Sequence, residues 1–220
     1  KTHLPSNDNQ FYRSEMIKIC GVGESQFETE IQPFLSSLPD TLQSAYLPVF
    51  GEVWFYLYSY QKNHQVIQSA ENIIKKIKEV WKPFLFSQWG NTLEQACGKL
   101  LREKRLTIAT AESCSGGLLS HRLTNIPGSS AYFYRGYVVY SNQAKIDTVG
   151  VPSSLIAEYG AVSEEVARAL AEGVREKSHT DIGIGITGIA GPSGGSKQKP
   201  VGLVYIGISN FQHTQVKKHL

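Results

Sequence analysis

Cysteine is scarce in this 220-residue sequence, which contains only Cys20, Cys97 and Cys114. Three cysteines with no paired CxxC spacing provide neither a disulfide framework nor a zinc motif, so a reducing, cytoplasmic setting is expected. No apolar run approaches the roughly 18 residues that cross a bilayer. Residues 1–5 also lack the apolar stretch of a signal peptide. We therefore expect a cytoplasmic protein without a membrane partner.

A strong charge of either sign is also missing, because 22 basic residues stand against 19 acidic ones for a net charge of +3. This balance does not by itself indicate nucleic acid as a partner. The 6 histidines are scattered, and no HxxE, HExxH or acidic cluster has the spacing of metal ligands, so no metal or cofactor is expected. Apolar residues make up 41% of the sequence, which is enough for a packed core.

The composition changes near residue 88, which predicts two domains. Aromatic residues concentrate before this point, whereas most glycines and a strand–helix alternation follow it. We expect a small α+β domain over residues 14–88 and a three-layer α/β/α domain over residues 89–220. Residues 1–13 are expected to be a linker or the remnant of a preceding domain. The sequence starts without methionine and ends in a strand-like run at Leu220, so a fragment of a longer protein is expected.

The α+β domain is predicted to follow the order β-α-β-β-α. Its expected elements are a strand at 16–20, a helix at 24–35, a hairpin of 41–50 with 53–60, and an amphipathic helix at 66–80. The run from Trp54 to Tyr56, together with Tyr58 and Tyr60, could form a face that stacks on bases. Alternation on a sheet that packs under a helix is the favoured interpretation of these aromatic residues.

The second domain is predicted from strands that alternate with helices, which indicates a sheet covered on both faces. Its expected strands are 106–111, 136–140, 181–187, 201–209 and a run from residue 214. Its expected helices are 92–104, 115–125, 142–148, 152–159 and 163–177.

The first feature that can carry chemistry is the turn from Ser113 to Gly117, where a buried strand passes into a helix. Backbone N–H groups at the start of the helix would point at a group bound there, so one turn could supply both a nucleophile and an oxyanion hole. Taken alone, Ser113 or Ser115 is more simply explained as a helix N-cap. Cys114 could itself attack a substrate, but a buried thiol is the favoured interpretation.

Two further segments follow the ends of predicted strands. Lys145 lies five residues past a strand end, near the sheet edge where open α/β sheets bind ligands, and a buried lysine can act as a general base. A solvated surface lysine is the alternative. The loop from Thr187 to Ser196 is rich in glycine and hydroxyl groups, and it could either wrap a phosphate or serve as a plain connection.

Taken together, these motifs closely resemble the C-terminal domain of the CinA family. The matching segments, in chain order, are Thr110 to Gly117, Ile126 to Ser130, Tyr140 to Lys145, Gly160 to Ser163, Thr187 to Pro192 and Lys199 to Gly202. Earlier in the chain, Cys20 to Ser25 resembles the start of the KH-like middle domain of full-length members. The resemblance covers the chain from about residue 90 to its end.

The resemblance implies an amidohydrolase that converts nicotinamide mononucleotide and water into nicotinate mononucleotide and ammonia, without metal or cofactor. Ser113 would be the nucleophile, Lys145 its general base and Tyr140 a residue that lines the site, with Ser115 as second choice for the nucleophile. Expected substrate-binding residues are Ser115, Gly116, Gly117, Thr187, Gly188, Ala190, Gly191 and Ser196.

The resemblance also implies features outside this sequence. Full-length members carry a nucleotide pyrophosphatase-like N-terminal domain, and they usually close with a Gly-Asp-Arg stretch and a helix whose arginine is a candidate phosphate ligand. A homo-oligomer is expected. The alternative function is a non-catalytic nucleotide- or protein-binding module of a competence- or DNA-damage-related protein. Nucleic-acid binding by the KH-like domain is disfavoured, because the GXXG clamp is missing.

Overall fold

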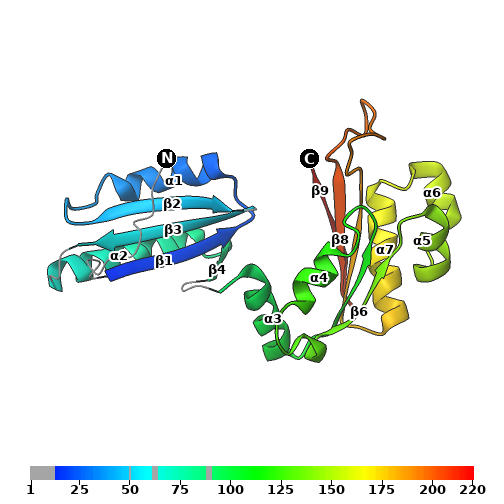
Figure 1. Cartoon of the computed structure of the whole chain (residues 1–220), viewed down its shortest axis with the longest axis horizontal. Helices are drawn as coiled ribbons and strands as arrows, with labels where there is room; N and C mark the ends of the chain where they lie inside the picture. The colour runs from blue at the N-terminus through cyan, green and yellow to red at the C-terminus, as the bar shows by residue number, and fades with distance from the viewer. Residues whose placement is uncertain (1–12, 50, 61–63, 88–90) are drawn as a thin grey trace. The chain divides into compact units, whose positions relative to one another are not determined.

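The computed structural model describes residues 13–49, 51–60, 64–87 and 91–220, which fall into two compact units that meet in sequence between Ala96 and Cys97 (Figure 1). The predicted linker, apart from Arg13, and the predicted domain boundary at 88/89 lie outside the described residues. None of the described helices is long and apolar enough to cross a membrane.

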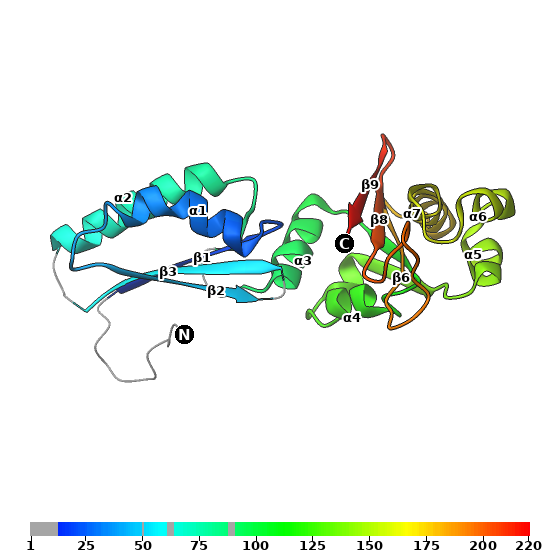
Figure 2. The same ribbon diagram turned by 90° about the horizontal axis from the view of Figure 1, so that it is seen from above.

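The first unit is a two-layer α+β fold. Its elements are β1 (Arg13–Cys20), α1 (Glu24–Leu35), β2 (Gln43–Val49), β3 (Glu52–Ser59), α2 (His64–Trp81) and β4 (Leu85–Ser87). They form an antiparallel sheet in the order β2-β3-β1-β4, and both helices lie on the same side of it (Figure 2). The expected order β-α-β-β-α is therefore corrected to β-α-β-β-α-β. The missed strand has three residues, which is too short for a periodic pattern to show.

The aromatic run of β3 divides between the two faces of this sheet. Phe55 and Leu57 are fully buried with Phe27 and Trp81 in the core beneath the helices. Trp54 and Tyr56 alternate with them, and so they point to the other face, where Lys18 Nζ lies 3.7 Å from the centre of the Trp54 ring. The alternation of aromatic residues in β3 therefore reflects a sheet that packs under helices on one face only.

The second unit has a five-stranded mixed sheet in the order β6-β5-β7-β8-β9. The strands are β5 (Ile108–Glu112), β6 (Phe133–Val138), β7 (Ile182–Gly188), β8 (Val204–Ser209) and β9 (Thr214–His219). The helices are α3 (Leu93–Lys104), whose first turn still belongs to the first unit, α4 (Leu118–Thr124), α5 (Asn142–Val149), α6 (Ser153–Tyr159) and α7 (Glu164–Ser178), with a short 3₁₀ turn, η1 (Ser129–Ala131). Strands β6, β5 and β7 run parallel, whereas β8 and β9 are antiparallel to their neighbours.

Helices cover both faces of this sheet, which confirms the predicted three-layer α/β/α architecture (Figure 1). One core joins α3 and α4 to β5 and β7 through Leu101, Leu123 and Ile108. The other core places α7 against the opposite face, where Gly185 lets the helix approach so closely that an added Cβ would lie 2.5 Å from the Ala167 carbonyl oxygen. Because three parallel strands end at one edge, the loops that follow them meet there.

Candidate active site

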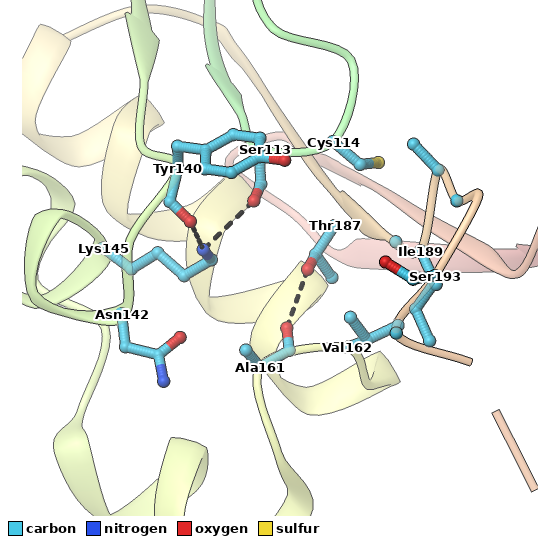
Figure 3. Close-up of a pocket in the computed structure, with 14 residues that line it drawn as sticks. Ser113, Cys114, Tyr140, Asn142, Lys145, Ala161, Val162, Thr187, Ile189 and Ser193 are labelled. Atoms are coloured by element: carbon cyan, nitrogen blue, oxygen red, sulfur yellow. Dashed lines mark hydrogen bonds between the residues drawn. The ribbon is translucent and has the colours of Figure 1, made fainter. Parts of the chain in front are cut away.

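Ser113 and Lys145 meet at the carboxyl edge of the parallel strands. Ser113 directly follows β5, while Lys145 lies in the first turn of α5, just beyond β6. Ser141 caps α5 by accepting a hydrogen bond from the Ala144 backbone N–H at 3.0 Å, and this cap sets the direction in which Lys145 leaves the helix. Figure 3 shows the Lys145 amine directed between Ser113 and the carbonyl of Tyr140.

The lysine amine is held by four oxygen atoms. Lys145 Nζ donates to Ser113 Oγ at 3.1 Å, and to the carbonyl oxygens of Val139 at 3.0 Å, Tyr140 at 3.0 Å and Ser141 at 3.5 Å. None of these four acceptors carries a formal charge. The lysine is therefore bound without the carboxylate that usually accompanies a buried cation.

Lys145 is only 1% exposed, and Ser113 only 7%. Burial lowers the pKa of the Lys145 ammonium because it removes water from the charged form, while the nearby Cys114 opposes this shift. The interpretation of Lys145 as a solvated surface lysine is thus wrong.

The turn after Ser113 is built differently from the sequence prediction. Helix α4 begins at Leu118 instead of Ser115, and its N-cap residue is Gly117, which provides no side-chain cap. Gly116 and Gly117 both have positive φ values, 60° and 96°, which let the chain turn tightly here. Neither serine is the N-cap, so the N-cap alternative is wrong and the Ser113 hydroxyl is left to contact Lys145.

A pocket of about 340 Å³ opens beside this pair. Its volume falls in the range of about 300–1,000 Å³ that small-molecule sites commonly have. It is lined by residues from the ends of all three parallel strands and from the α6–α7 connection: Ser113, Cys114, Tyr140, Asn142, Lys145, Ala161, Val162, Thr187, Gly188, Ile189, Ala190, Gly191, Ser193 and Gly194. Tyr140 lines this pocket, as expected, and its side chain is 72% exposed.

Four of the predicted substrate-binding residues do not line this pocket. The Ser115 hydroxyl donates to Glu112 Oε2 at 2.7 Å, and Gly116 and Gly117 complete the turn behind Ser113. Ser196 lies farther along the glycine-rich loop, where its hydroxyl accepts a hydrogen bond from the Lys199 N–H at 3.0 Å. Substrate contacts by these four residues stay a prediction.

Asn142, Ala161 and Val162 were not predicted site residues, and Ile189, Ser193 and Gly194 were predicted only as part of the Thr187–Ser196 loop, although all six line the pocket. Asn142 lies between Tyr140 and Lys145, and Ala161 lies in the Gly160–Ser163 motif, so adjacency to a motif was the available signal. The Thr187 hydroxyl donates to the Ala161 carbonyl at 2.7 Å, which ties two walls of the pocket together (Figure 3).

Cys114 lies at the pocket but is half-buried. Burial raises the pKa of its thiol, against the opposing effects of the Cys114 and Ser115 backbone N–H groups and of Lys145. A raised pKa disfavours the thiolate, so Ser113 is the better nucleophile.

No group of three histidine, cysteine, aspartate or glutamate side chains suited to a metal ion occurs within residues 13–49, 51–60, 64–87 and 91–220.

Fold and site together define a three-layer α/β/α domain with a buried serine–lysine pair at the edge of its parallel strands. The family model of the CinA C-terminal domain matches residues 90–220. The chain belongs to the CinA family, as the motifs predicted.

Known relatives agree with this assignment. A protein of Moorella thermoacetica that bears the name of a competence-damage inducible protein is 47% identical over 208 residues, which cover 94% of this chain and 50% of the relative. A CinA-like protein of Chloroherpeton thalassium is 43% identical, covering 92% of this chain and 49% of its own length. The chain thus spans about half the length of these relatives.

Among solved structures, the competence/damage inducible protein CihA of Agrobacterium tumefaciens is 39% identical, with a TM-score of 0.57. The match covers 58% of this chain and 78% of that protein.

Proposed function

We propose that this domain hydrolyses the carboxamide of nicotinamide mononucleotide to the carboxylate and ammonia, with Ser113 as nucleophile and Lys145 as general base. The observation that carries the proposal is the 3.1 Å contact between Lys145 Nζ and Ser113 Oγ, made by a lysine that is 1% exposed. The identity of the substrate rests on the resemblance to the CinA family.

The contacts of Lys145 suit a neutral amine. Such an amine has two N–H groups and one lone pair. If the carbonyls of Val139 and Tyr140, each 3.0 Å away, accept the two N–H groups, the lone pair faces the Ser113 hydroxyl. This is the orientation that a base needs before it can take the serine proton.

The chemical steps balance with these two side chains. Ser113 Oγ attacks the carboxamide carbon while its proton passes to Lys145 Nζ. The C–N bond of the tetrahedral intermediate then breaks, and Lys145 returns the proton to the departing nitrogen, which leaves as ammonia. Water next attacks the ester on Ser113, Lys145 takes a proton from it, and the C–O bond to Ser113 breaks as the hydroxyl is restored.

The oxyanion would be stabilised by the backbone N–H groups of Cys114 and Ser115. These two residues directly follow Ser113 in the turn between β5 and α4. The loss of one such donor commonly slows a reaction by about 10²–10³. For the phosphate, the pocket offers neutral donors such as Asn142 and Ser193, since its one lysine is engaged with Ser113.

The test is release of ammonia from nicotinamide mononucleotide by the purified chain. Ser113→Ala is expected to reduce the rate to background, and Lys145→Met to reduce it by about 10²–10⁴-fold, the usual contribution of a general base. Ser130→Ala and Lys104→Met alter exposed residues and serve as matched controls. Full activity of Ser113→Ala would refute the mechanism, and no release by the wild-type chain would refute the activity.

The alternative of a non-catalytic binding module is less well supported, because simple binding gives no reason to bury an uncompensated lysine against a serine. Activity of the whole protein, a homo-oligomeric state and a preceding nucleotide pyrophosphatase-like domain remain proposals. Sedimentation of the purified chain would test the oligomeric state.

A further inference from the structure

Glu112 is a buried carboxylate directly beside the proposed nucleophile. It is the last residue of β5, immediately before Ser113, and its exposed fraction is 0%. It does not line the pocket, so it is not placed to touch a substrate. A fully buried glutamate is rare unless its oxygens are well satisfied, which raises the question of what holds this one.

The carboxylate receives four hydrogen bonds from the segment that follows Ser113. Oε2 accepts from Ser115 Oγ at 2.7 Å and from the Leu119 N–H at 3.0 Å. Oε1 accepts from the Ser120 N–H at 2.8 Å and from Ser120 Oγ at 2.6 Å. Burial alone would raise the pKa of Glu112, but the bonds from Ser120, Ser115 and Leu119 outweigh it and lower the pKa, so the carboxylate is ionised.

These contacts explain how the turn is held without a conventional cap. Gly117 offers no side chain to the first N–H groups of α4, and Glu112 reaches over from the preceding strand to accept two of them. Two N–H groups at the start of α4 are therefore committed to Glu112, contrary to the expectation that the helix start faces a ligand. The Ser113 hydroxyl therefore does not cap α4.

Glu112 is also connected to both catalytic groups through the backbone. Its carbonyl accepts from the Val139 N–H at 2.8 Å, and the Val139 carbonyl in turn accepts from Lys145 Nζ at 3.0 Å. On the other side, its carboxylate accepts from Ser115 Oγ and so anchors the turn two residues past Ser113. The main chain on one side and the carboxylate on the other thus fix the geometry of the turn.

We propose that Glu112 is a positioning residue that clamps the Ser113–Gly117 turn through Ser115, so that the Ser113 hydroxyl keeps its position against Lys145 Nζ. This inference rests on the proposed amidohydrolase activity. It assigns the Ser115 hydroxyl to the clamp and not to the substrate. A displacement of about 1 Å in a reacting group can cost about 10²-fold in rate.

The experiment compares two single hydroxyl deletions around the same carboxylate. Ser115→Ala removes the bond on the side of the turn, whereas Ser120→Ala removes one on the side of the helix. We expect Ser115→Ala to lower kcat by about 10-fold to 100-fold with KM within about twofold, because the lost interaction matters in the transition state. Ser115→Thr, which keeps the hydroxyl, should restore kcat. The fold-loss of kcat in Ser120→Ala should be at least five times smaller than the fold-loss in Ser115→Ala.

A second readout does not depend on turnover. The pH profile of Cys114 alkylation, followed by peptide mass, should move to higher pH in Ser115→Ala, because the turn that holds the thiolate-favouring N–H groups of Cys114 and Ser115 loosens while the charge of Glu112 stays in place. A purely structural role would lower Tm and leave this profile of the folded protein in place.

Unchanged kcat with a raised KM in Ser115→Ala, or an unmoved Cys114 profile in that variant, would overturn the proposal. If the wild-type chain releases no ammonia, the proposed activity fails, and the Cys114 profile still decides whether Glu112 clamps the turn.

Discussion

The Ser113–Lys145 pair should make activity depend on pH in a defined direction. Lys145 must be neutral to accept the serine proton, and an ordinary lysine has a pKa of about 10.4, which would leave only about 0.1% of it neutral at pH 7.5. Burial of Lys145 lowers its pKa and so raises this fraction. We expect kcat/KM to rise about tenfold per pH unit below the pKa of Lys145 and to level off above it, with the midpoint below about 10.4.

The assay is ammonia release at constant ionic strength from about pH 6 to 10, with kcat/KM as the quantity that reports on the free enzyme. Lys145→Arg should be inactive at every pH, because a guanidinium does not lose its proton in proteins. Cys114→Ser should keep the rising limb, which separates titration of the lysine from titration of the neighbouring thiol. A flat or falling profile, or an active Lys145→Arg variant, would refute the assignment of Lys145 as base.

Three further changes test the framework around the site. Gly185→Ala should lower the free energy of unfolding by about 3 kcal/mol in urea titrations, because its Cβ would overlap a backbone carbonyl of α7. Asp181→Ala should cost about 1–2 kcal/mol, because the Thr107 N–H and hydroxyl donate to Asp181 at 2.7 and 2.8 Å. Those bonds lower the pKa of Asp181, so this contribution should be full above about pH 4 and vanish as pH falls through the folded-state pKa. Lys199→Met should raise KM about threefold or more in steady-state assays with kcat nearly unchanged, because Lys199 Nζ donates to the Tyr159 carbonyl at 2.6 Å and ties the glycine-rich loop to the pocket wall.

Lys197 provides the matched control for the loop lysine, since it is exposed in the same loop. Lys197→Met should leave KM unchanged. An equal rise of KM in both variants would show that the charge of the loop matters and that the Lys199–Tyr159 contact does not. An unchanged free energy of unfolding in Gly185→Ala would contradict the close approach of α7 to the sheet. An unchanged value in Asp181→Ala would show that the hydrogen bonds from Thr107 contribute little to stability.

Most secondary structure and the family could be predicted from local patterns. The spacing of apolar residues in α2 and α7, the Ser163 side chain that caps α7, and the glycines after β5 are short-range signals, and the structure contains the elements they predict. Short or edge features were harder to predict. Strand β4 has three residues, and α4 starts three residues later than expected because Gly117, not Ser115, occupies its N-cap.

The site, too, was predictable from the sequence only in part. Its motifs could be read along the chain because each lies where a strand ends, and parallel strands bring such ends to one edge. What Ser113 and Lys145 can do depends on contacts between residues 32 positions apart. Desolvation of Lys145 and the choice of its partners arise only when β5, β6 and α5 pack together, as does the capture of the α4 N–H groups by Glu112. Local sequence could therefore name the serine and the lysine, whereas tertiary packing decided that the serine is free of capping and that the lysine is buried beside it.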